Sequence, residues 1–139
     1  MEQRKSRWLS VFLAVLFMTA AWLPASVEGA GENQTVYVIP VEQTVEQGMA
    51  AFLERSVQEA EEADADRIIF ELDTPGGAVD AAGEIASIIN GTSIPTTAYV
   101  TDQAMSAGAF LALSADEIAM APETEMGAAQ VIDGSGNAA

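Results

Sequence analysis

The chain of 139 residues contains no histidine and no cysteine. Without cysteine it can form no disulfide and carry out no thiolate chemistry. The absence of both residue types argues against a zinc site, because these are the usual zinc ligands. No acidic loop has the spacing that a calcium site needs. We therefore expect no bound metal, and we expect no cofactor of another kind. A serine nucleophile in this chain would also lack histidine, its commonest base.

Basic residues are scarce as well: five Lys and Arg stand against 21 Asp and Glu, for a formal net charge of −16. Past residue 30 the only basic residues are Arg55 and Arg67, whereas all the acidic residues except Glu2 and Glu28 lie there. This balance argues against a nucleic-acid partner, whose phosphates require Lys and Arg. It also argues against tight contact with anionic lipid headgroups. We interpret the acidic residues as a solvated surface.

The one long hydrophobic run lies at the N-terminus. It covers residues 8–23, behind a basic cluster at residues 4–7 and before a small-residue stretch at 24–30. This order is typical of a secretory signal peptide. The run is shorter than the roughly 20 residues that cross a bilayer comfortably. We expect residues 1–30 to be a signal peptide or, alternatively, an uncleaved membrane anchor, with the rest of the chain at the extracytoplasmic face of the cell membrane.

Past residue 30 the sequence alternates between strand-like and helix-like segments. Four short runs rich in β-branched and apolar residues predict strands: 36–41, 67–72, 96–100 and 117–121. Three segments with apolar residues at helical spacing predict helices, the last of them buried: 45–63, 79–89 and 105–114. Strands separated by helices predict an α/β fold with right-handed crossovers and a mostly parallel sheet. The Gly/Ser-rich stretch 133–139 is typical of a loop or linker.

Two short segments carry the pattern of a serine-based active site. Asp73 to Gly77 predicts a strand that runs into a Pro-Gly-Gly turn, and Ala104 to Gly108 places Ser106 at the start of an apolar helix. The first turn of a helix has unpaired amides and a partial positive charge, which would stabilise an alkoxide on Ser106. Taken alone, such a serine is more often a packing residue, and Pro-Gly-Gly is more often a plain turn. The joint occurrence of both segments, each at a strand-to-helix junction, favours a nucleophile.

Backbone amides near this serine could form an oxyanion hole. One would be the amide of Ala107, which follows Ser106. The second would come from Gly76 or Gly77, where the missing side chain lets a substrate carbonyl approach the backbone. Two such donors matter, because removing one from an enzyme typically lowers the rate by about 10²–10³.

In combination, these segments resemble the NfeD family, in its long form with an N-terminal ClpP-class serine protease domain. The similarity extends over about residues 35–132 and is carried by four segments: Ile69 to Asp80, Ala98 to Val100, Ala104 to Ala109 and Met126 to Ala129. It implies an α/β fold, a ClpP/crotonase-like spiral of β-β-α units that is incomplete at its C-terminal side in residues 31–139. It also implies a serine–lysine dyad with Ser106 as nucleophile and the amides of Gly77 and Ala107 as the oxyanion hole.

In that family the lysine base lies downstream of a Gly-Ala-Ala segment, here Gly127 to Ala129. The only lysine in this chain is Lys5, within the expected signal segment. A lysine acts as a base only where burial keeps it neutral near pH 7. We therefore expect the base to be missing, residues 31–139 to be part of a longer protease domain, and the chain alone to be inactive. A short protein that has lost catalysis is the alternative.

The resemblance implies a membrane-associated serine endopeptidase that cleaves hydrophobic segments of membrane proteins. It suggests a stomatin-like protein as one substrate and a homodimer as the assembly. The alternative is a non-catalytic peptide-binding or scaffold module in membrane quality control, because the same groove could hold an extended peptide by strand addition. Crotonase-like acyl-CoA chemistry is disfavoured, because basic residues to meet the CoA phosphates are lacking.

Overall fold

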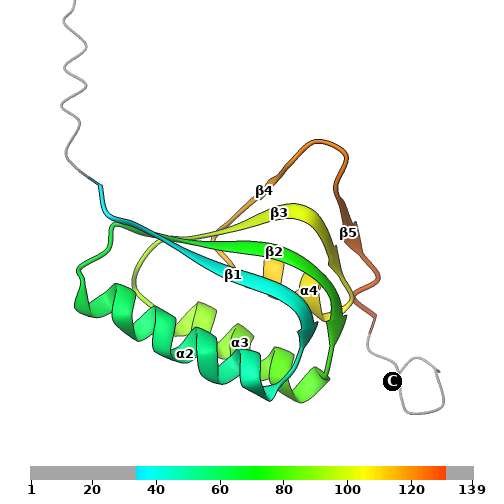
Figure 1. The fold of residues 1–139 in the computed structure, drawn as a ribbon, viewed down its shortest axis with the longest axis horizontal. Coiled ribbons are helices and arrows are strands. Elements are labelled where there is room, and N and C mark those ends of the chain that lie inside the picture. Colours follow the sequence, from blue (N-terminus) through cyan, green and yellow to red (C-terminus); the bar gives the residue numbers. More distant parts are fainter. Residues whose placement is uncertain (1–33, 131–139) are drawn as a thin grey trace, which may run out of the picture. The chain divides into compact units, whose positions relative to one another are not determined.

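A sheet of five parallel strands lies at the centre of the described part of the chain. The computed structural model describes residues 34–130, so the expected signal segment at 1–30 and the stretch 133–139 lie outside the described residues. The strands are β1 (Val36–Val45), β2 (Arg67–Gly77), β3 (Thr96–Met105), β4 (Glu117–Met120) and β5 (Glu125–Gly127). Their order is β1-β2-β3-β4, and β5 pairs with the last residues of β3, beyond β4 (Figure 1). The predicted α/β class and parallel sheet are confirmed.

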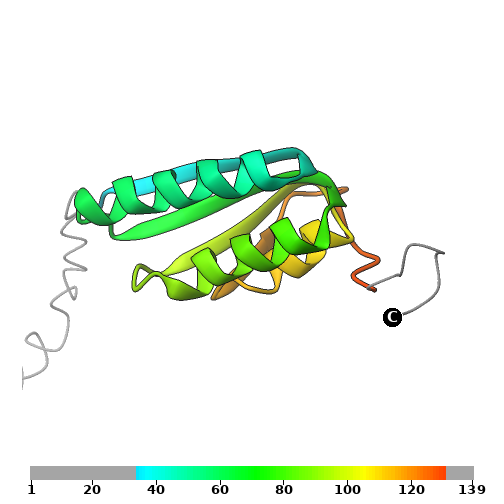
Figure 2. The same ribbon diagram turned by 90° about the horizontal axis from the view of Figure 1, so that it is seen from below.

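Within residues 34–130, three helices connect the first four strands: α2 (Gln47–Glu62), α3 (Val79–Gly91) and α4 (Ala107–Ala112). Figures 1 and 2 show them on one side of the sheet, where α2 packs against β1 and α3, and α4 packs against β2, β3 and α3. Each helix therefore joins two neighbouring parallel strands, as the sequence predicted. Of the helices in this part of the chain, none has the length and apolar character to span a bilayer.

The core forms where alternate strand residues meet the helices. On β2, Ile68, Phe70 and Leu72 are all at most 1% exposed, whereas the residues between them are partly exposed on the other face. The period of two in the strand matches a helical stripe on α2 that includes Leu53 and Val57. Full burial of a side chain of this size contributes about 1.5–3 kcal/mol. Strand β2 is thus firmly anchored, and it carries the glycine pair to the end of the sheet.

Strands β1 and β2 continue past the ends that the sequence predicted. Val45 pairs with Gly77, so β1 does not end at residue 41 and the helix expected from residue 45 begins only at residue 47. The expected turn at residues 75–77 is wrong, because this segment is part of β2. The ladder between β1 and β2 shifts register between Asp73 and Gly76, which is a β-bulge. The bulge accommodates the turn-forming residues without ending the strand.

The third helix and the segment after it also differ from the sequence prediction. A buried helix was expected over 105–114, but α4 spans only 107–112. Its outer side is open, since Phe110 is 46% exposed and Leu113, just after the helix, is 64% exposed. The short strand β5 was not predicted, and it pairs with residues 103–105 at the end of β3.

Candidate active site

The candidate site lies at the edge of the sheet where β1, β2 and β3 all end. These strands are parallel, so their carboxyl ends share one edge (Figure 1), which is where open α/β sheets usually bind ligands. Ser106 follows the last residue of β3. Its N–H donates a hydrogen bond to the carbonyl of Gly127 at 2.8 Å. Strand β5, absent from the sequence prediction, therefore fixes the backbone at Ser106.

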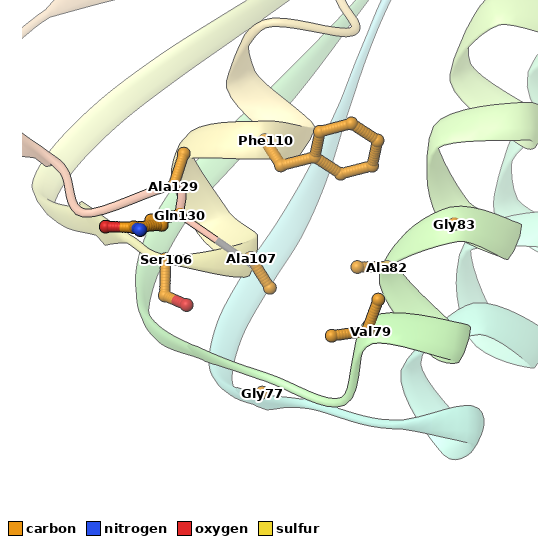
Figure 3. Close-up of a pocket in the computed structure, with 9 residues that line it drawn as sticks. All are labelled: Gly77, Val79, Ala82, Gly83, Ser106, Ala107, Phe110, Ala129 and Gln130. Atoms are coloured by element: carbon orange, nitrogen blue, oxygen red, sulfur yellow. The ribbon is translucent and has the colours of Figure 1, made fainter. Parts of the chain in front are cut away.

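Ser106 occupies a strained turn between β3 and α4. Its φ is 53° and its ψ is −115°, in a region that non-glycine residues rarely adopt and that costs about 1–3 kcal/mol. Its carbonyl accepts a hydrogen bond from the N–H of Phe110 at 3.2 Å, which begins the helix. A comparable strand–turn–helix elbow presents the nucleophilic serine of α/β-hydrolases. The Ser106 side chain is half-buried and points toward the Gly77 segment in Figure 3.

Gly76 brings the end of β2 against this turn. Its φ is +99°, and a Cβ atom at this position would lie 2.7 Å from the Met105 carbonyl oxygen, 2.8 Å from the Ser106 Cβ and 3.0 Å from the Ala107 nitrogen. A side chain is excluded both by the backbone conformation and by these contacts. The glycine is therefore required for β2 to approach the serine this closely.

The backbone amides of the site differ in their partners. Ala107 is the first residue of α4, so its N–H has no intrahelical acceptor. The Gly76 N–H donates to the Thr74 hydroxyl at 3.1 Å, so this amide is already engaged. Gly77 lines the same pocket as Ser106 and Ala107. The structure thus brings together all four residues that the sequence singled out, and it distinguishes Gly77 from Gly76.

A cavity of about 290 Å³ opens beside the serine. Its walls come from the end of β2, from α3 and α4, and from the segment after β5 (Figure 3). The lining residues are Gly77, Val79, Ala82, Gly83, Ser106, Ala107, Phe110, Ala129 and Gln130. Most of these side chains are apolar or small, and the volume is close to the lower end of ligand sites, roughly 300 Å³. The cavity could take one large apolar side chain of a bound peptide.

The described residues supply no base to this pocket. They include two basic side chains, Arg55 and Arg67, and neither lines it. Arg67 begins β2, at the opposite end of the strand, where it forms an ion pair with Glu117 at 2.9 Å and donates to Thr97 at 2.6 Å. Among residues 34–130, the pocket lining contains a hydroxyl but no titratable side chain.

Two features of the site were missed from the sequence. One is Gly127, whose carbonyl holds Ser106 and which belongs to a strand of three residues. The other is Thr74, which is fully buried beneath the glycine pair. Strand alternation gave a signal for Thr74, since it stands two residues after the buried Leu72, and a buried hydroxyl needs a hydrogen-bond partner.

Solved structures with the same fold define the class of protein. A serine-to-alanine mutant of 1510-N, a membrane-bound stomatin-specific protease, superposes with a TM-score of 0.68 and 37% identity over 71% of this chain and 49% of that chain. A lysine-to-alanine mutant, in complex with a substrate peptide, gives 0.68 and 36% over 76% and 51%. ClpP1 from Listeria monocytogenes, at 20% identity, gives 0.58 over 70% and 61%. The chain is an α/β protein of the ClpP-like fold, so the fold class that the resemblance implied is confirmed.

The chain belongs to the NfeD1b family, whose N-terminal domain matches residues 35–139. Membrane protein NfeD1b of Bacillus subtilis (strain 168) is 52% identical over 131 residues, covering 94% of this chain and 29% of the relative. Membrane-bound protease PH1510 of Pyrococcus horikoshii is 39% identical over 102 residues, covering 71% and 23%. The resemblance stated from the sequence is confirmed. The chain spans less than a third of the length of these curated relatives.

Proposed function

We propose that this chain is the N-terminal part of a membrane-associated serine endopeptidase. Ser106 is the nucleophile, and the amides of Ala107 and Gly77 form the oxyanion hole. One observation carries this proposal: the end of β2 lies so close to Ser106 and Ala107 that Gly76 leaves no room for a Cβ atom, which brings Gly77 to the same apolar pocket as these two residues. The names of the similar proteins, a membrane protein and a membrane-bound protease, support the same function.

In the proposed reaction the Ser106 oxygen attacks the carbonyl carbon of the scissile peptide bond while a base takes its proton. In this proposal the negative charge on the former carbonyl oxygen is stabilised by the amides of Ala107 and Gly77, which act as preorganised donors. The C–N bond then breaks, the leaving amine takes a proton, and water hydrolyses the acyl-enzyme. The base is a lysine outside residues 34–130, kept neutral by burial. Residues 31–139 are, on this proposal, part of a longer domain that contains this lysine.

The substrate class follows from the pocket, which suits an apolar side chain. We propose that the substrates are hydrophobic segments of membrane proteins, including stomatin-like proteins. Support comes from the similar proteases, which are named as stomatin-specific, one of them in complex with a substrate peptide. Residues 1–30 serve as signal or anchor, the domain works at the extracytoplasmic face, and it assembles as a dimer.

A serine-directed fluorophosphonate tests the nucleophile. The full-length protein, meaning the longer protein that contains the proposed lysine, should be labelled at Ser106. Ser106→Ala should abolish this labelling. Ser56→Ala is the matched control and should leave labelling unchanged, because this hydroxyl donates to the Phe52 carbonyl of its own helix and lies outside the pocket lining. An unlabelled wild type, or equal labelling of Ser106→Ala, would count against the protease.

A non-catalytic peptide-binding module is the second candidate. It is favoured by the absence of a titratable side chain from the described pocket lining. Such a module would bind an apolar peptide equally well with Ser106 or alanine at this position. It would show no turnover of that peptide in the full-length protein, and this result separates the two functions.

A further inference from the structure

Thr74 makes two hydrogen bonds from a position with no solvent exposure. Its hydroxyl accepts the N–H of Gly76 at 3.1 Å and donates to the carbonyl of Gln43 on β1. Gly76 and Gln43 both have positive φ, 99° and 67°. One hydroxyl therefore connects two backbone positions of positive φ on neighbouring strands, of which Gln43, as a non-glycine residue, is strained.

The β-bulge explains why a hydroxyl is needed at this place. Glu42 pairs with Asp73 and Thr44 pairs with Gly76, so Gln43 alone faces both Thr74 and the proline that follows it. Proline has no N–H to donate across the ladder. The Thr74 hydroxyl donates to the Gln43 carbonyl instead, and with its lone pair it also satisfies the next amide of its own strand.

The methyl group of Thr74 faces the helix that carries the other half of the site. A Cβ atom at Gly108, in the first turn of α4, would lie 2.5 Å from the Thr74 Cγ2. The helix start thus rests directly on the Thr74 side chain. Thr74 contacts the backbone of the glycine pair through its hydroxyl and the start of α4 through its methyl group.

We propose that Thr74 is a positioning residue of the Ser106 site. Its hydroxyl fixes the backbone at Gly76, which sets the direction of the Gly77 amide, and its methyl group sets how closely α4 and the Ala107 amide approach. This role rests on the proposed function, because it concerns the same oxyanion hole. Thr74 itself does not line the pocket, so it acts on the reacting atoms only through these neighbours.

Two substitutions separate the hydroxyl from the methyl group. Thr74→Val keeps the shape but leaves the Gly76 N–H and the Gln43 carbonyl without their partner. Loss of one oxyanion donor lowers rates by about 10²–10³, so a misdirected donor should lower the fluorophosphonate labelling rate at least tenfold. Peptide turnover should lose kcat with little change in KM, because the pocket walls are untouched. Thr74→Ser keeps the hydroxyl and removes only the methyl contact with α4, so it should lower the labelling rate less than Thr74→Val does.

A double substitution tests the methyl contact independently of Thr74→Val. Gly108→Ala drives a Cβ atom into the Thr74 methyl group and should lower the labelling rate. Adding Thr74→Ser removes that methyl group and should restore the labelling rate. Such a rescue requires that the two residues interact, because the effects of two independent substitutions would add. This comparison remains informative if Thr74→Val does not fold.

Labelling rates of the full-length protein are measured per folded molecule, with the folded fraction taken from thermal unfolding. Equal rates for Thr74→Val and wild type, or no rescue of Gly108→Ala by Thr74→Ser, would overturn the positioning role while leaving the protease intact. A wild type without labelling would overturn the proposed function, and the role of Thr74 with it.

Discussion

At the scale of single residues, backbone positions with positive φ within residues 34–130 are concentrated around Ser106. Four of the six residues with positive φ belong to this region: Gln43, Gly76, Ser106 and Ala128. Gln43 and Gly76 are joined through one threonine hydroxyl, and Ala128 follows the carbonyl that holds the Ser106 N–H. Such strain persists only where surrounding contacts over-determine the backbone, and it gathers at functional sites. The strained residues therefore support the site independently of any motif.

Gly76→Ala tests whether the glycine is required by the contacts around it. A Cβ atom would lie 2.7 Å from the Met105 carbonyl oxygen at a φ of +99°. We expect a loss of about 1–3 kcal/mol in the free energy of unfolding and at least a 10²-fold slower labelling of Ser106. Urea unfolding and fluorophosphonate kinetics measure the two effects. Gly91→Ala is the control, because a Cβ there meets nothing within 4 Å. Normal labelling of Gly76→Ala would disprove the close approach.

At the scale of helices and strands, the sequence predicted four strands and three helices by type but not where they end. Periodicity located the segments, and the expected strand-to-helix junctions at Gly77 and Ser106 placed the two at the same end of a parallel sheet. Pairing with a neighbouring strand then overrode the local turn signal at residues 75–77. Strand β5 has only three residues and forms by pairing with the last residues of β3. The role of Thr74 depends on a register shift that periodicity does not report.

Helix α3 forms one wall of the pocket, so we expect it to limit the size of the substrate side chain that can bind there. Gly83 lines the pocket, and a Cβ at this position would meet nothing within 4 Å. Gly83→Ala should therefore raise stability by about 0.5–1 kcal/mol through helix propensity. Gly83→Leu should slow labelling by a probe with a bulky apolar group about tenfold or more, and spare a methyl probe. Ser87→Leu, one turn further along α3 and outside the lining, should spare both probes. Equal slowing by Gly83→Leu and Ser87→Leu would contradict the size limit.

The loop between α4 and β4 is tied to β3 by a carboxylate. Asp116 accepts hydrogen bonds from the N–H and the hydroxyl of Thr96, both at 2.8 Å. These bonds, the backbone one first, together with the charge of Arg67, lower the pKa of Asp116 against the opposing effect of burial. Because the pKa of Asp116 is lower in the folded than in the unfolded protein, its ionised carboxylate stabilises the fold. This stabilisation is fully present above the ordinary pKa of Asp, about 3.9, and is lost as the pH falls through the pKa of the folded state.

Asp116→Asn should therefore destabilise the protein near neutral pH. The difference in unfolding free energy from the wild type should shrink as the pH falls below about 4. Urea titrations at several pH values measure this difference. Glu123→Gln serves as the control for removing one negative charge from this acidic chain. A difference that does not change with pH would contradict the role of the Asp116 charge.

At the scale of the whole molecule, residues 34–130 supply some parts of the proposed active site but not all of them. They contain the proposed nucleophile, the two proposed amide donors and an apolar pocket, yet their pocket lining has no base. Binding and catalysis should therefore separate: the pocket is formed by α3, α4 and the ends of the strands, whereas proton transfer in the proposed mechanism depends on a lysine outside residues 34–130.

The chain of 139 residues should bind an apolar peptide with an affinity close to that of the longer protein but cleave it at least about 10³-fold more slowly. Removing the base of a serine protease leaves only the residual rate that the oxyanion hole and binding provide. Fluorescence anisotropy with one labelled peptide gives the affinity, and product analysis gives the rate. In the longer protein that the proposal requires, a lysine-to-methionine scan should reproduce the slow rate at one position. Comparable cleavage by the two proteins would place the base within the 139 residues and refute the division.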